Sequence, residues 1–72
     1  MQAEYMIFKT NVSRTIDVAN LIFNFNQDES IKDWGIDIED VDKVLRVSSQ
    51  EKSARDIEIM MKDLGYHCEE LK

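Results

Sequence analysis

The stretch KTNVSRTIDVANLI, Lys9 to Ile22, joins the end of a short apolar segment to an amphipathic helix. The run from Tyr5 to Lys9 is rich in aromatic and branched residues and is too short for a helix, so it predicts a strand. Asn11, Ser13 and Thr15 are candidate helix starts, because their side-chain oxygens can accept the free amide hydrogens of a first turn. The stretch therefore predicts a strand that is followed at once by a helix.

This first helix is predicted to run from about Thr15 to Gln27. Its core-facing stripe is expected to consist of four apolar residues on one face of a 3.6-residue repeat: Val18, Leu21, Ile22 and Phe25. Three more apolar residues repeat at helical spacing outside this stripe: Ile16, Ala19 and Phe23. They are a candidate interaction surface, and the alternative is plain packing at the edge of the core.

The middle of the chain predicts a hairpin. In WGIDI the apolar residues alternate with small or charged ones, as in a strand with one buried face: Trp34, Ile36 and Ile38. The charged segment Glu39 to Lys43 predicts a turn. The following KVLRV predicts the partner strand, with Leu45 and Val47 facing inward.

A second helix is predicted from about Ser53 to Leu64. Ser53 and Asp56 resemble a capping box, and a helical stripe follows them: Ile57, Met60, Met61 and Leu64. Gly65 is well placed to adopt the left-handed conformation that ends a helix, and YHCEEL then predicts a last strand.

The resulting order is strand, helix, strand, strand, helix, strand. With right-handed crossovers, two such units fold most simply into a four-stranded antiparallel sheet with both helices on one face. We therefore predict an α+β, ferredoxin-like sandwich that forms a single domain over residues 1–72.

The length and net charge of the chain argue against several classes of function. A chain of 72 residues has room for one thin core, because so short a chain buries only about 60% of its unfolded surface. The net charge of −6 disfavours binding to nucleic acid and to anionic membranes, since both depend on basic residues. A single cysteine, Cys68, excludes an internal disulfide. With neither a secretory leader nor a membrane-spanning run, we expect a cytoplasmic protein.

Three segments give the chain a resemblance to the heavy-metal-associated, copper-chaperone-like domains over nearly its full length. KTNVSRTIDVANLI stands where that family has a Gly-Met-x-Cys-x-x-Cys loop, WGIDIED resembles its second strand, and KDLGYHCEEL resembles its closing segment. The resemblance implies the ferredoxin-like fold. In the family, the two thiolates bind a soft or borderline metal, which is passed to a partner by docking of this loop.

The metal-binding residues of that family are missing here. Val12 takes the place of the methionine, and Arg14 and Asp17 take the two cysteine positions. A guanidinium is always cationic and cannot coordinate a metal. We expect no metal at these two positions and no cofactor, and we predict that Arg14 and Asp17 form a surface ion pair at the helix start.

His67 and Cys68 are the best remaining soft or borderline ligands, but neighbours on a strand point to opposite faces. We therefore expect His67 to be an ordinary surface residue and Cys68 to be a small buried hydrophobe. The acidic run from Asp37 to Asp42 loosely resembles a calcium loop. It lacks the glycine and the glutamate that such a loop requires, so a solvated turn is expected.

The one histidine and the one cysteine are neighbours that should point to opposite faces, and no other set of nucleophile and base is evident, so we do not expect an enzyme. The sequence favours a small, non-enzymatic interaction module that resembles a heavy-metal-associated domain without its cysteines. A protein partner or a homodimer is expected, through Ile16, Ala19 and Phe23 or through a sheet edge. The alternative is a copper or zinc chaperone-like protein with non-standard ligands, drawn from four residues: Met1, Met6, His67 and Cys68.

Overall fold

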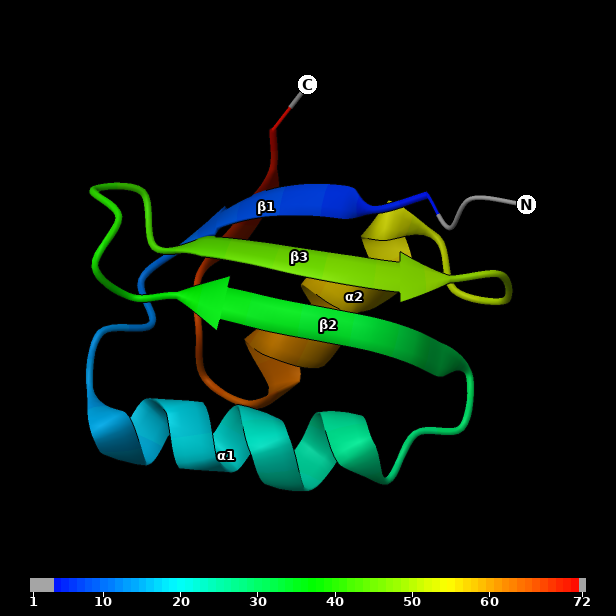
Figure 1. The fold of residues 1–72 in the computed structure, drawn as a ribbon, viewed down its shortest axis with the longest axis horizontal. Coiled ribbons are helices and arrows are strands. Elements are labelled where there is room, and N and C mark those ends of the chain that lie inside the picture. Colours follow the sequence, from blue (N-terminus) through cyan, green and yellow to red (C-terminus); the bar gives the residue numbers. More distant parts are fainter. Residues whose placement is uncertain (1–3, 72) are drawn as a thin grey trace.

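The computed structural model describes residues 4–71 and contains the six predicted elements in the predicted order (Figure 1). The elements are β1 (Met6–Thr10), α1 (Thr15–Asn26), β2 (Ile31–Asp37), β3 (Val44–Ser49), α2 (Ala54–Asp63) and β4 (Cys68–Glu70). Across the described residues, no helix has the length and apolar character needed to span a membrane.

The strands form one antiparallel sheet in the order β2-β3-β1-β4, which confirms the ferredoxin-like α+β fold. Phe8 of β1 lies opposite Leu45 of β3 on one side and opposite Glu70 of β4 on the other. β2 and β4 are therefore the two sheet edges. Figure 1 shows β2, β3 and β1 side by side, with α2 behind them and α1 next to β2.

One hydrophobic core lies between the sheet and the two helices. Its fully buried side chains come from two strands, both helices and the β1–α1 loop: Phe8, Val12, Leu21, Phe25, Leu45, Val47, Ile57 and Met61. Leu45 and Val47 confirm the predicted inward pair of β3. Since both helices contribute to the same core, they cover the same face of the sheet.

α1 is rotated relative to the predicted stripe. Leu21 and Phe25 are buried as expected, and Val18 packs against the core, but Ile22 is 47% exposed. The prediction was wrong at Ile22 because Asp17, not Ile22, completes the buried face of this helix. A buried carboxylate must reach its hydrogen-bond partners, and this requirement determines which face of α1 is turned toward the core.

The start of α1 also differs from the prediction. Within residues 4–71, the first turn is not held by any of the predicted capping side chains: Asn11, Ser13 and Thr15. Arg14 is the N-cap, and the carboxylate of Asp17 accepts its backbone N–H at 3.1 Å. The side chain of Asn11 instead accepts the backbone N–H of His67 at 2.9 Å, which ties the β1–α1 loop to the start of the last strand.

The ends of α2 follow the sequence closely. Ser53 Oγ accepts the backbone N–H of Asp56 at 3.2 Å, and the Asp56 carboxylate accepts that of Ser53 at 2.9 Å. This confirms the capping box. Gly65 has φ 95° and ends the helix as predicted, because a residue without Cβ adopts this conformation without strain.

Candidate functional site

A polar cluster closes the N-terminal end of α1. The guanidinium of Arg14 reaches Asp17 with two nitrogens, Nη2 to Oδ1 at 3.1 Å and Nε to Oδ2 at 3.3 Å. The hydroxyl of Tyr66, from the turn between α2 and β4, donates to Asp17 Oδ1 at 3.0 Å. Asn20 in turn donates to the Tyr66 oxygen at 3.0 Å. The cluster therefore joins two segments that are far apart in the sequence.

The predicted pairing of Arg14 with Asp17 is present, but Asp17 does not lie at the surface. Asp17 is only 4% exposed, whereas most of the Arg14 side chain is open to solvent. Besides Arg14 and Tyr66, the carboxylate accepts the backbone N–H of Ser13 at 3.5 Å. These donors occupy both carboxylate oxygens, which together offer about four lone-pair sites.

The surroundings of Asp17 favour its charged form. The guanidinium of Arg14 lowers the pKa of Asp17 from 3.8 to about 2, with help from backbone N–H groups and the Tyr66 hydroxyl, while burial acts in the opposite direction. A carboxylate with a lowered pKa stabilises the fold above its ordinary pKa, and this contribution is lost as the pH falls through the folded-state value.

Asp17→Asn is therefore expected to lower the free energy of unfolding at neutral pH. The difference in this free energy between the variant and the parent protein should become smaller as the pH falls from about 4 to about 2. Urea unfolding of both proteins at a series of pH values measures this gap. The pKa values of Asp28 and Asp56 are also lowered, but both groups are present in both proteins and cancel in the comparison. A gap that stays constant down to pH 2 would contradict the role of the Asp17 charge.

The hydrogen bonds of this cluster are suited to holding the start of α1 against the turn after α2, and not to binding a metal. Arg14 cannot coordinate a metal, and the oxygens of Asp17 already accept hydrogen bonds from the protein. Sequence reasoning found this pair and missed Tyr66 and Asn20. The only sequence signal for Tyr66 was its position directly after the helix-ending Gly65, which says nothing about its hydroxyl partner.

No family model, curated protein or solved structure matches this chain. The resemblance to heavy-metal-associated domains therefore stays a prediction from three sequence segments. What the chain does has to be inferred from its own surfaces.

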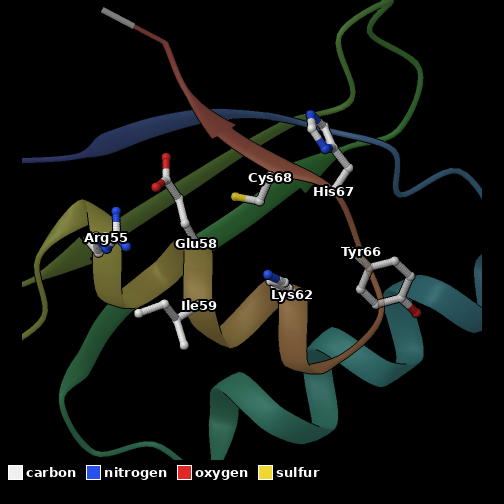
Figure 2. Close-up of a pocket in the computed structure, with 7 residues that line it drawn as sticks. All are labelled: Arg55, Glu58, Ile59, Lys62, Tyr66, His67 and Cys68. Carbon is white, nitrogen blue, oxygen red and sulfur yellow. The ribbon is translucent and has the colours of Figure 1, made fainter.

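His67 and Cys68 lie next to each other at the start of β4. His67 is exposed, and Cys68 packs partly buried against the core. Figure 2 shows the imidazole and the sulfur leaving the strand in different directions. Burial, together with the nearby Glu58 carboxylate, raises the pKa of the Cys68 thiol from 9.0 to about 12, which disfavours the thiolate that binds metals.

Met6 lies at the opposite end of β1 from Thr10, which is the residue that pairs with Cys68. Met6 packs against the core, and Met1 lies outside the described residues. Among residues 4–71, no three His, Cys, Asp or Glu side chains come together in a way that could hold a metal ion. The acidic run forms a turn of its own, because Asp37 accepts the backbone N–H groups of Glu39 and Asp40.

The remaining feature is an exposed apolar surface on α1, which we call the α1 outer face: Ile16, Ala19, Ile22 and Phe23. Phe23 is 66% exposed and Ile16 is 57% exposed. The sequence predicted this surface without Ile22, which was assigned to the core. The only charged residue in α1 is the buried Asp17, so the outer face carries no charge.

Proposed function

We propose that this chain is a small, non-enzymatic interaction module that forms a homodimer through the α1 outer face. The observation that carries the proposal is an exposed apolar surface without charge in a protein whose net charge is −6. Contiguous exposed apolar surface marks interaction sites more often than scattered single hydrophobes do. Ala19 lies three or four residues from each of Ile16, Ile22 and Phe23, so the outer face is contiguous on the helix surface.

The absence of charge favours a second copy as the partner. Two chains of net charge −6 repel each other, and approach is least unfavourable where neither surface contributes charge. A symmetric dimer places the same patch of both copies in contact, so each α1 packs against its counterpart, with Phe23 at the C-terminal end of the patch. Helices packed in this way lie about 8–10 Å apart.

The expected dimer is weak. α1 has 12 residues and is about 18 Å long, which supports an interface at the small end of the specific range. We expect a dissociation constant of about 1–100 µM, which is typical of transient association. Such a module would assemble and separate as its concentration changes.

Phe23→Asp is expected to abolish the dimer, because each copy would then place a charge in an apolar interface. Size-exclusion chromatography with light scattering should give twice the 8.5 kDa chain mass for the parent protein at high concentration and the single-chain mass for the variant. Val41→Asp is the matched control. Val41 is 90% exposed in the β2–β3 turn, so this variant adds the same charge elsewhere and should still dimerise.

The proposal fails in two cases. A parent protein that stays monomeric at about 1 mM has no dimer in the expected range. A dimer that survives Phe23→Asp uses another surface.

A further inference from the structure

A second candidate surface lies on a different part of the molecule, between the edge strand β4 and one flank of α2. It is a groove of about 440 Å³. Its lining comes from α2, from the turn after it and from β4: Arg55, Glu58, Ile59, Lys62, Tyr66, His67 and Cys68 (Figure 2). This surface shares no residue with the α1 outer face.

The backbone of β4 has outward-facing groups at this edge. Leu71 donates its N–H to the carbonyl of Ile7 at 2.8 Å, so the backbone groups of Leu71 point toward β1. In an antiparallel ladder the direction alternates from residue to residue, and the backbone groups of Cys68 and Glu70 therefore point away from β1, toward the groove. A strand added beside β4 would pair with these two residues.

The chain's own Glu58 already occupies one of these positions. Its carboxylate accepts the outward N–H of Glu70 at 3.1 Å. An unpaired backbone N–H on an edge strand can pair with an added strand. A side chain that accepts this N–H satisfies the donor and makes the edge less available for such pairing. Glu58 thus takes the place that a carbonyl of an added strand would take.

The flank of α2 that lines the groove carries three side chains in a row along the helix. Arg55, Ile59 and Lys62 are four and three residues apart on the same flank, in the order basic, apolar, basic. Arg55 and Lys62 form no ion pair within residues 4–71, and Ile59 is 48% exposed. The rise from Arg55 to Ile59 is about 6 Å, close to the roughly 6.7 Å between alternate side chains of a strand.

We propose that the groove between β4 and α2 binds an extended peptide as a fifth strand, with two acidic side chains facing Arg55 and Lys62 and an apolar side chain between them on Ile59. In this arrangement the peptide residues that face α2 are also the ones whose backbone pairs with Cys68 and Glu70, because directly opposed residues point to the same face. The peptide therefore displaces the Glu58 carboxylate from Glu70.

The probe is an acetylated and amidated peptide, Thr-Glu-Thr-Val-Thr-Glu-Thr, added to isotope-labelled protein and followed by NMR. The titration uses the Phe23→Asp background, which separates this site from dimerisation through α1. We expect the amide of Cys68 to gain protection from hydrogen exchange on binding. The amides of Glu69 and Leu71, which point toward β1, should keep their exchange rates.

Variants test each part of the site. Ile59→Asp is expected to weaken binding by at least about tenfold, and so is the double change Arg55→Glu with Lys62→Glu. Lys32→Glu, on β2 at the opposite edge of the sheet, reverses one charge away from the groove and should bind normally. Glu58→Ala removes the internal competitor and should bind more tightly than Glu58→Gln, which removes the charge but keeps an acceptor oxygen.

A peptide with an N-methyl group on its valine decides whether strand pairing takes place. It keeps every side chain but has lost the N–H that pairs with β4, so its binding should be weaker by at least about tenfold. Equal binding of the methylated peptide would overturn the proposal, because attraction between side chains would then be sufficient. Absence of any shift at about 1 mM peptide, or shifts that lie outside the groove, would overturn it as well.

Discussion

Phe25→Ala is expected to lower the free energy of unfolding by about 3–5 kcal/mol, while Phe23→Ala should change it by less than about 0.5 kcal/mol. The two residues are of the same type and lie two positions apart on α1. Phe25 is 1% exposed, and its ring centroid lies 5.1 Å from that of Trp34, whereas Phe23 is 66% exposed. Removing the Phe25 ring leaves a cavity in the hydrophobic core, and removing the Phe23 ring leaves none.

The loss at Phe25 is large for a chain of this size. A domain of 72 residues has a total stability of roughly 4–11 kcal/mol, so the expected loss removes from about a quarter to all of it. Urea unfolding followed by the fluorescence of the single tryptophan, Trp34, measures both variants at a concentration at which light scattering reports monomers. Equal losses at the two positions would show that α1 is rotated differently from the structure described.

The rotation of α1 could not be read from the sequence. The predicted stripe and the outer set repeat at the same helical period, so periodicity alone leaves Ile22 on the border between them. What settles the rotation is a polar requirement. Asp17 is buried and must meet Arg14 and Tyr66, and Tyr66 comes from the far end of the chain. An isolated pattern of hydrophobic residues contains no information about such a partner.

The order of elements was more readable because it depends on local signals. The charged turn from Glu39 to Lys43, the Ser53 capping box and Gly65 each act within a few residues, and each correctly placed an element or its end. Strand limits were less accurate. β2 begins at Ile31, before the predicted alternation, and its register shifts between Ile31 and Asp33, which depends on the partner strand rather than on local sequence.

The candidate surfaces were predicted unevenly for the same reason. The α1 outer face was found through its helical spacing, since Ile16, Ala19 and Phe23 share one helix. The groove beside β4 was missed, although the sheet edges were recognised as possible pairing sites. It combines a flank of α2 with the edge of a strand that follows it, and only the packing of these two elements brings Glu58 to Glu70.

The same comparison in α2 separates stability from binding. Ile57→Ala is expected to lower the free energy of unfolding by about 2–5 kcal/mol, because Ile57 is fully buried in the core. Ile59→Ala should lower it by less than about 1 kcal/mol, because Ile59 is 48% exposed on the flank of the helix that faces the groove. Both variants are compared with the parent protein by urea unfolding at one pH and one protein concentration.

For binding of the Thr-Glu-Thr-Val-Thr-Glu-Thr peptide, the order of the two effects should be reversed: the change at Ile59 should have the larger effect and the change at Ile57 the smaller. Ile59→Ala removes the apolar contact under the valine and should weaken binding, whereas the folded fraction of Ile57→Ala keeps the groove and should bind like the parent. This reversal is informative because a general destabilisation of α2 would lower both the free energy of unfolding and the affinity for the peptide in both variants. If Ile59→Ala lost stability as severely as Ile57→Ala, Ile59 would belong to the core, and the row of Arg55, Ile59 and Lys62 would have no exposed centre for a partner to contact.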